Sequence, residues 1–283
     1  PTAADIAAGR AGLAGEASPR RIYANRFGAA RGAAAKRFGG RPGSIQAVAD
    51  GLAWLTRHQD ANGRWDRLGF GRHCPPDQPC GNAADDRKDR NADVGVTALA
   101  LLAFLGDGHL HTDGDDPHRA VVARAIDWLL AQQNARSGAF GPFERVARLD
   151  PDNPALLGRA RDPLLMYNHS IAVLALAEAY SMTRDARLPP AVRRGVRFLE
   201  KTQQPEGGWD YWPQTTHRND TSITGWVVMA LKSAATAGVE VSPLTLYRAG
   251  LHFVRATRPN GLVWYAEKRP GVRVDSATGR PIL

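Results

Sequence analysis

Apolar residues in this chain fall into helix-length stretches of two kinds, which alternate along the sequence. One kind, such as 93–105 (DVGVTALALLAFL), is apolar on nearly every face, as expected of a helix surrounded by other helices. The other kind carries its apolar residues on one stripe, which is typical of an amphipathic helix with one buried face. The apolar stretches lie at 93–105, 167–180 and 219–238, and the amphipathic ones at 45–59, 117–133, 190–203 and 243–257. The pattern predicts an all-α fold.

A short unit recurs at the end of each amphipathic stretch. It consists of an aromatic-aliphatic pair, a Gln shortly after the pair, a Gly-containing turn and a second aromatic residue. The well-kept copies contain Trp54, Gln59 and Trp65; Trp128, Gln133 and Phe140; and Phe198, Gln203 and Trp209. A fourth copy, 250–264, has Arg258 in place of the Gln. Four copies of one unit indicate a repeat protein.

The unit has a structural interpretation. Its turn, for example Asn62-Gly63, supplies the positive φ with which helices commonly end. A Gln at this point can hydrogen-bond main-chain groups at the start of a neighbouring helix. The aromatic residue beyond the turn can pack on nearby apolar surface. We therefore expect a clasp between successive helical hairpins.

The pattern Arg-Gly-x2-Phe-Leu-x3-Gln-x3-Gly-x-Trp at 194–209 resembles the QW repeat of the squalene–hopene cyclase, oxidosqualene cyclase and protein prenyltransferase superfamily. The chain looks most like the bacterial squalene-cyclase-like proteins with prenyltransferase and squalene oxidase repeats. The resemblance covers about 44–264 and implies an α/α toroid, in which outer and inner helices alternate around a central cavity. Three hairpins and one further outer helix are fewer than a closed toroid needs. The resemblance therefore predicts an incomplete toroid.

Positive charge is concentrated at the start of the chain. The 283 residues carry a formal net charge of +9, and residues 1–43 hold eight Lys or Arg against two Asp or Glu. We expect a basic, partly disordered leader over 1–43 with one helix at about 22–38, a repeat domain over 44–265 and a tail over 266–283. The basic residues form no stripe with interleaved aromatics, so nucleic acid is not an expected partner. Because the chain begins with Pro1, we expect an upstream segment, and an anchor there would allow membrane association.

Cys74 and Cys80 are the only two cysteines, and they lie in a polar insertion over 66–91. Their spacing and flanking prolines favour a small disulfide loop, which would place the protein in the bacterial cell envelope or outside the cell. Without a disulfide we expect the cytoplasm. Free thiols and a zinc site are the alternatives, and the zinc site would need two more ligands, of which His73 is the nearest. The pattern assigns no metal and no other cofactor.

Polar residues stand at the expected starts of the three apolar helices. Asp93, Asn168 and Asp220 fall at matching positions, and His169 follows Asn168. Asp and Asn are preferred N-cap residues, which is one explanation. The other is that the helix starts meet at one mouth of the cavity, where Asp220, His169 and Asp93 would form a catalytic or ligand-binding group.

The acid motif of class II terpene cyclases, Asp-x-Asp-Asp, finds little support here. Residues 113–116 match it by letter, but Pro117 and an amphipathic helix follow, so a solvated acidic turn is the better interpretation. At 217–221, the position that resembles the motif, only Asp220 and Thr221 match. Arg218 would lower the pKa of this acid, which is wrong for a proton donor. The zinc set of protein prenyltransferases needs a Cys at an inner-helix start, and these starts have none.

We therefore expect a ligand- or partner-binding module. Tyr167, Trp212 and Trp226 are the expected lining of a central apolar cavity. Its ligand would be an apolar small molecule, or a protein partner would complete the toroid. One alternative is a terpene-cyclase-like isomerase or lyase that uses Asp220 with His169, and another is a polysaccharide-active toroid with paired acids. Whether the protein is an enzyme stays open at this point.

Overall fold

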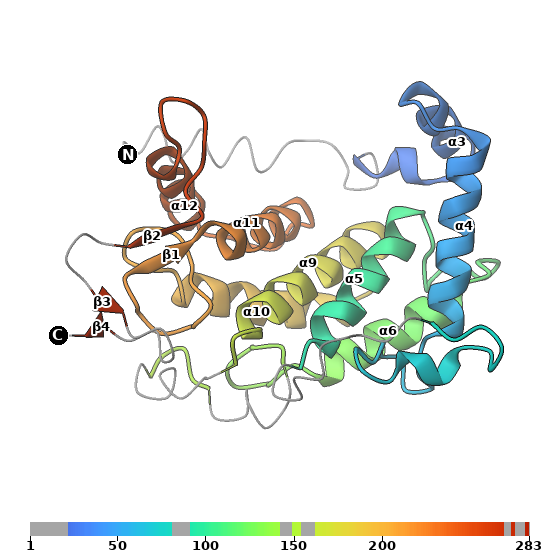
Figure 1. The fold of residues 1–283 in the computed structure, drawn as a ribbon, viewed down its shortest axis with the longest axis horizontal. Helices are drawn as coiled ribbons and strands as arrows, with labels where there is room; N and C mark the ends of the chain where they lie inside the picture. Colours follow the sequence, from blue (N-terminus) through green and yellow to red (C-terminus); the bar gives the residue numbers. More distant parts are fainter. Residues whose placement is uncertain are drawn as a thin grey trace.

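The computed structural model describes residues 22–80, 91–141, 149–153, 162–268, 273–274 and 281–282. Among these residues the regular secondary structure is almost all helix, with only short strands, which confirms the predicted all-α class (Figure 1). The α-helices are α3 (Gly28–Arg37), α4 (Pro42–Arg57), α5 (Asp93–Gly106), α6 (Arg119–Ala131), α9 (Leu165–Thr183), α10 (Leu188–Lys201), α11 (Thr221–Thr236) and α12 (Pro243–Ala256). The short elements are η1 (Ala24–Arg26), η2 (Phe70–His73), β1 (Arg218–Asp220), β2 (Ala266–Lys268), β3 (Arg273–Val274) and β4 (Pro281–Ile282). β1 pairs antiparallel with β2, and β3 with β4.

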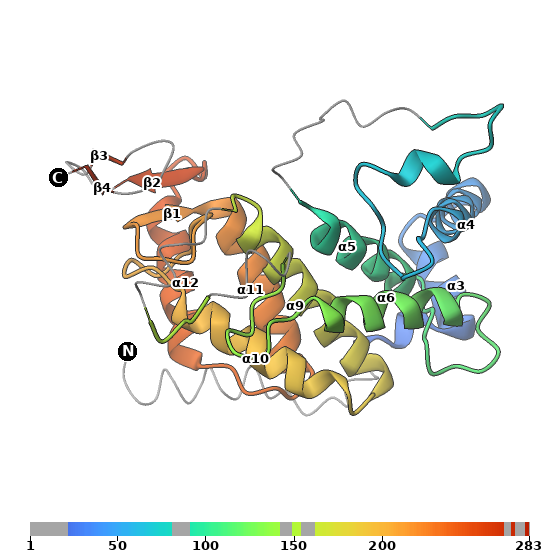
Figure 2. The same cartoon turned by 90° about the horizontal axis from the view of Figure 1, so that it is seen from below.

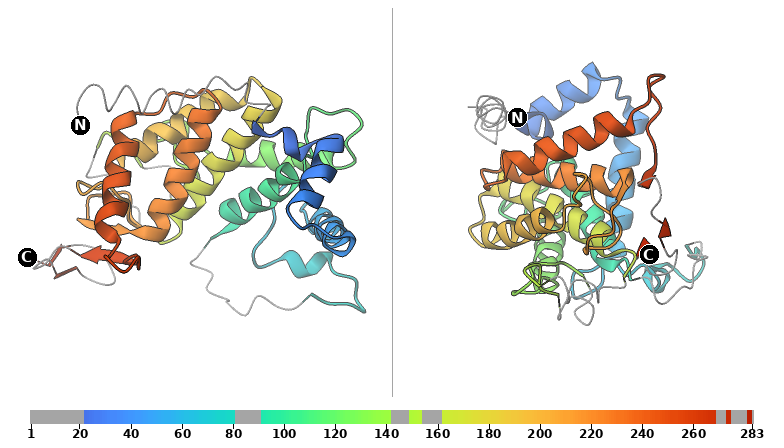
Figure 3. Two further views of the ribbon diagram at one scale, coloured as in Figure 1. Left: turned by 90° about the horizontal axis from the view of Figure 1, so that it is seen from above. Right: turned by 90° about the vertical axis from the view of Figure 1, so that its left-hand side faces the viewer.

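Three helices, α5, α9 and α11, form a row at the centre of the molecule (Figure 1). α9 lies in the middle and contacts both neighbours. α12 packs beside α11, and α4 packs beside α5, at the two ends of the row (Figure 3). α10 packs against α9 and α6 against α5 along one side of the row (Figure 2). The row is called the inner layer below, and α4, α6, α10 and α12 are called the outer layer.

The sequence explains this division into layers. α9 is buried along most of its length because its apolar residues surround the helix on all sides. Its alanines, Ala172, Ala175 and Ala179, are fully buried and allow neighbouring helices to approach closely. α10 instead buries one stripe that includes Val192, Val196 and Leu199 and leaves its arginines outside. Apolar helices therefore occupy the middle of the molecule and amphipathic helices cover them.

Each of three turns at the ends of outer helices contains a glycine that the packing requires. Gly63, Gly138 and Gly207 have φ of +98°, +77° and +102°. A β-carbon at any of them would lie 2.2–2.4 Å from a carbonyl oxygen of the next outer helix. These oxygens belong to Arg124, Arg194 and Arg248. Glycine is needed here both for its dihedral angle and for the close approach of two backbones.

A glutamine beside each turn links it to the next outer helix. Gln59 Nε2 donates to the carbonyls of Gly63, at 3.0 Å, and of Val121, at 2.9 Å. Its Oε1 accepts from the Arg124 guanidinium. Gln133 bonds in the same way to Gly138, Ala191 and Arg194, and Gln203 donates to Gly207 and Thr245. The two contacts of the glutamine Nε2 therefore recur at α4–α6, α6–α10 and α10–α12, and the arginine contact to Oε1 recurs at the first two.

The fourth turn, after α12, differs. Arg258 replaces the Gln and stacks over the Trp264 ring, with the guanidinium 3.5 Å from the ring centroid. Trp264 is half exposed, whereas Trp209 is fully buried. Among the described residues, no outer helix follows α12 to cover this turn.

The segment before α3 packs on the inner layer through Glu178 of α9. Tyr23 Oη donates to this carboxylate at 2.8 Å, and Arg26 forms an ion pair with it, also at 2.8 Å. Ser233 of α11 donates to the same group at 2.9 Å. Burial, together with the nearby Glu178 charge, raises the pKa of Tyr23 to about 12.

The helix predicted over about 22–38 is too long, because α3 covers only Gly28–Arg37. η1 and α3 are separate, because Phe27 is extended and Gly28 has a φ of +50°. Tyr23 is buried and Phe27 packs against the core, but Phe38 is 77% exposed. Residues 1–21 of the predicted leader lie outside the described residues.

Candidate functional site

Asp220 lies at the N-terminus of α11 and is fully buried. Its Oδ1 accepts from the main-chain N–H of Ser222 and Ile223, at 3.0 and 3.2 Å, and from the Ser222 hydroxyl at 2.6 Å. Its Oδ2 accepts from the Arg218 guanidinium at 3.1 Å. The carboxylate therefore acts as an N-cap with both oxygens engaged.

Arg218 joins Asp220 to a second buried acid, Asp210. The guanidinium of Arg218 forms ion pairs with both carboxylates. Asp210 also accepts from the Thr216 hydroxyl at 2.8 Å. Burial raises the pKa of Asp210, and the Arg218 charge opposes this effect. One cation thus holds two carboxylates beside the start of α11.

A chain of hydroxyl groups leads outward from Asp220. Because the Ser222 hydroxyl donates to Asp220, it accepts from the Tyr167 hydroxyl, which lies 2.6 Å away. The Tyr167 ring packs edge-on against Tyr211, and the Tyr211 hydroxyl lies 3.0 Å from that of the exposed Tyr265. Desolvation, with hydrogen bonds to Tyr265 and Tyr167, raises the pKa of Tyr211. These hydroxyls form a polar group at one end of α9 and α11.

Asp93 is the first residue of α5 and makes no hydrogen bond to this group of hydroxyls among the described contacts. Its Oδ2 pairs with Arg64 at 3.0 Å, and its Oδ1 accepts from the main-chain N–H of Arg67 at 3.1 Å. Burial raises the pKa of Asp93, against the effect of the Arg67 hydrogen bond. The carboxylate holds the loop after α4 against the start of α5.

His169 is fully buried between α9 and α10. Its Nδ1 accepts from the Phe140 main-chain N–H at 3.0 Å, so its Nε2 donates to the Gly195 carbonyl at 3.1 Å. Burial lowers the pKa of His169 to about 4, so the ring is neutral near pH 7. Thr97 and Thr224 accept in the same way from the N–H of the turn aromatics Trp65 and Trp209.

These contacts correct the predicted equivalence of Asn168 with the two aspartates. His169 matches Thr97 and Thr224, which follow Asp93 and Asp220 by four residues, so the matching residue of α9 is Leu165. α9 begins there, and its N-cap is Leu164. Asn168 lies inside the helix and joins it to α5, accepting from Gly95 N at 2.9 Å and donating to Asn91 O at 2.8 Å. The acceptors lie 32, 29 and 15 residues beyond their turn aromatics, so no fixed spacing in the sequence signals this register.

The inner layer also presents a face directed away from the outer layer. His169 and Val173 of α9 are the residues that face Gly195 of α10. By helical periodicity, Tyr167 and Leu174 lie on the opposite side of α9, and both are half-buried.

α5 and α11, which flank α9, also have apolar residues on the side directed away from the outer layer. Trp226 and Met229 of α11 lie opposite Thr224, and Met229 is 46% exposed. Leu99 of α5 lies opposite Thr97 and is 44% exposed. We call these residues the inner face: Leu99, Tyr167, Leu174, Trp226 and Met229. The third predicted lining residue, Trp212, lies half-buried in the connection before β1.

Two cavities lie along α4. One, of about 400 Å³, is lined by α3 and α4 residues that include Gly32 and Ile45. The other, of about 630 Å³, lies between α4 and the end of α5 and is lined by residues such as Trp54, Leu55 and Ala103. Leu52 is the only buried residue of α4, so this helix packs loosely against its neighbours. Asp220, Tyr167 and Ser222 do not line either cavity.

Cys74 and Cys80 are free thiols in the structure. Both sulfur atoms lie near His58 Nε2, at 3.4 and 3.2 Å. His73, the ligand expected from sequence, instead places its Nε2 2.7 Å from Asp60. Sequence reasoning missed His58 because it stands at the end of α4, outside the insertion that contains the cysteines.

None of the described helices combines the length and the apolar character that a membrane crossing requires. No family model matches the chain, and no solved structure matches it. A squalene–hopene cyclase from Bradyrhizobium diazoefficiens is 30% identical over 164 residues, which are 58% of this chain. The chain spans only 19% of that relative's length. The similarity supports a distant relationship to the squalene–hopene cyclase superfamily.

Proposed function

We propose that α4 to α12 form consecutive QW-type repeats of a partial α/α toroid, and that the inner face binds an extended apolar ligand with one polar end. The three recurring Gln and Gly contacts support the repeat assignment, since each joins one outer helix to the next. The distant similarity to a squalene–hopene cyclase is consistent with it. The hairpins are α4–α5, α6–α9 and α10–α11, with α12 as a further outer helix.

The observation that carries the binding proposal is the inner face itself. Leu99 of α5 and Met229 of α11 expose nearly half of their surface, and Leu174 of α9 and Trp226 of α11 are half-buried. Apolar surface grouped on one side of a molecule is typical of a binding site. The hydroxyls of Tyr167 and Ser222 stand at one end of this face and would bind a hydroxyl group of the ligand. A linear isoprenoid alcohol has this combination of properties.

The terpene-cyclase alternative receives less support from the geometry. An acid that protonates an alkene must keep its proton and direct it toward the substrate. Asp220 instead accepts three hydrogen bonds at Oδ1 and an ion pair at Oδ2. Both ring nitrogens of His169 are hydrogen-bonded to main-chain groups, Nδ1 to Phe140 N and Nε2 to Gly195 O. Neither nitrogen is therefore directed at Asp220. Binding is therefore the function that we propose.

The test is the affinity for farnesol, followed through the quenching of tryptophan fluorescence. Met229→Asp places a charge on the inner face and should weaken binding at least about tenfold, which corresponds to about 1.4 kcal/mol. Val254→Asp is the matched control, because Val254 is 72% exposed on α12 and lies outside the inner face. Equal affinities of both variants and the unchanged protein would contradict the proposal.

A further inference from the structure

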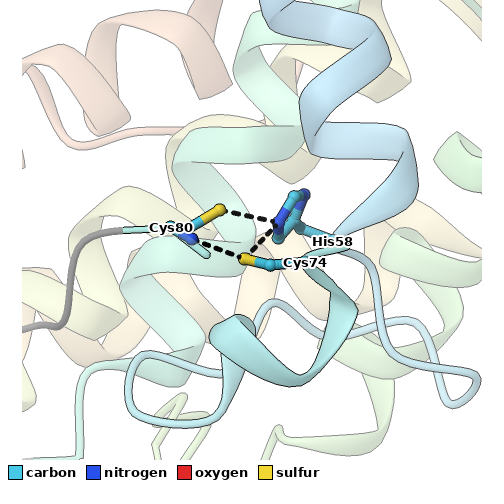
Figure 4. Close-up of side chains that lie close together, drawn as sticks. All are labelled: His58, Cys74 and Cys80. Carbon is cyan, nitrogen blue, oxygen red and sulfur yellow. Dashed lines mark hydrogen bonds between the residues drawn. The ribbon is translucent and has the colours of Figure 1, made fainter. Parts of the chain in front are cut away.

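A histidine and two cysteines meet at the end of α4 (Figure 4). His58 is the C-cap of α4, Cys74 follows η2, and Cys80 comes six residues later. One side-chain atom from each of the three lies within 4.8 Å of the others. Figure 4 shows both sulfur atoms directed toward the same edge of the His58 ring.

The orientation of His58 is fixed by its other nitrogen. His58 Nδ1 lies 2.7 Å from the Trp54 carbonyl, so it carries the proton and donates to that oxygen. Nε2 therefore presents its lone pair to the two sulfurs. The ring is 1% exposed and stacks on Trp54 with 3.8 Å between centroids. A buried imidazole held by a carbonyl, with its free nitrogen beside two thiols, is the arrangement of a metal-binding histidine.

The distances suit zinc. Zn–S bonds of about 2.3 Å and Zn–N bonds of about 2.0–2.1 Å in a tetrahedron place nitrogen and sulfur about 3.6 Å apart. His58 Nε2 lies 3.4 Å from Cys74 Sγ and 3.2 Å from Cys80 Sγ, so a small outward movement of the sulfurs would admit the ion. The Cys80 main-chain N–H lies 3.1 Å from Cys74 Sγ and would donate to that thiolate. Two thiolates would also neutralise the charge of one Zn²⁺.

We propose that His58, Cys74 and Cys80 bind one Zn²⁺ ion, with water at the fourth position. Bound zinc would attach the loop that contains η2 to the end of α4. Few other contacts hold α4, since Leu52 is its only buried residue. His73 takes no part, because its Nε2 is engaged by Asp60. Three protein ligands and one water would resemble the ligand count of catalytic zinc sites more than that of closed structural ones.

The test uses the whole chain, purified with a reductant, stripped with a chelator and then titrated with Zn²⁺ and with Co²⁺. We expect one Zn²⁺ per chain, and a Co²⁺ spectrum with thiolate charge-transfer bands and the strong visible bands of tetrahedral cobalt. His58→Gln and Cys74→Ser should each weaken Zn²⁺ binding by more than the 10–100-fold that loss of an outer partner costs. His73→Gln is the matched control and should change the affinity less than about twofold, because this ring lies outside the proposed ligand set.

Three results would overturn the proposal. The first is no uptake of Zn²⁺ by the reduced protein, and the second is uptake that His58→Gln leaves unchanged. The third is a Cys74–Cys80 disulfide, visible as the loss of two hydrogen masses, in protein prepared without added oxidant. If the variants fail to fold, the Co²⁺ spectrum of the unchanged chain still decides whether sulfur ligates the ion.

Discussion

At the scale of single residues, the glutamines at the turns connect the outer helices. Gln133 donates to the carbonyls of Gly138 and Ala191, both at 2.9 Å, and accepts from Arg194. Its neighbour Gln132 is equally half-buried but makes one bond, of 3.4 Å, within its own helix. The two adjacent glutamines therefore differ in their contacts: Gln133 joins two outer helices, and Gln132 bonds only within its own helix.

We expect Gln133→Ala to lower the free energy of unfolding by about 1–3 kcal/mol, because it leaves two carbonyls and a guanidinium without their partner. Gln132→Ala should cost about 0.5 kcal/mol or less, as is usual for residues without such contacts. Urea denaturation measures both. Equal losses from the two substitutions would show that the contacts between helices add nothing to stability.

His169 gives the fold a pH dependence of predictable sign. Its pKa is about 4 in the folded protein and about 6.5 when unfolded, so the unfolded chain binds more protons between these values. The contribution of His169 to the free energy of unfolding has its full value above pH 6.5. It falls by about 3 kcal/mol in all as the pH drops toward 4.

His169→Thr tests this, because Thr97 and Thr224 occupy the matching positions in the other two units. The threonine hydroxyl can still accept from Phe140, although the protein loses packing. The unfolding free energy of the variant should fall less between pH 6.5 and 4 than that of the unchanged protein. Parallel pH profiles would contradict the assignment of this slope to His169.

At the scale of elements, the close contact of α9 with α10 depends on Gly195. A β-carbon there would lie 2.5 Å from Val173 Cγ2. Gly250 of α12 is also helical, but it has nothing within 4 Å of an added β-carbon.

Gly195→Ala should therefore destabilise the protein by about 1–3 kcal/mol, as overpacking does in other cores. Gly250→Ala should stabilise it by about 0.4–1 kcal/mol, because alanine favours the helix and restricts the unfolded chain. Thermal unfolding of the two variants measures the difference. Stabilisation by both would mean that α9 and α10 are not held this closely.

The positions of these elements were largely predictable from the sequence. Apolar residues on every face identified α5, α9 and α11, and one-sided stripes identified α4, α6, α10 and α12. The N-cap of α9 was placed at Asn168 rather than Leu164 because Asn168 resembles an N-cap, whereas its amide bonds to Gly95 of α5 and to Asn91. The Tyr167–Ser222 contact and the approach of His58 to the cysteines join residues far apart in sequence, and no local pattern encodes them.

At the scale of the whole molecule, the inner layer is a row with two ends. α4 and α12 flank it, and the segment from Tyr23 to Arg26 crosses it at Glu178. The described residues offer an apolar ligand two kinds of surface: the inner face, and the cavities of about 400 and 630 Å³ along α4. The Tyr167–Ser222 hydroxyls stand beside the inner face only, which is why we place the ligand there.

The most direct test is photolabelling with a benzophenone derivative of farnesol, followed by mass spectrometry of the labelled peptides. The label should appear on peptides of α9 and α11, around Leu174 and Met229, and excess farnesol should remove it. A label confined to peptides of α3 and α4 would place the ligand in the cavities along α4 and contradict the inner face as its binding site.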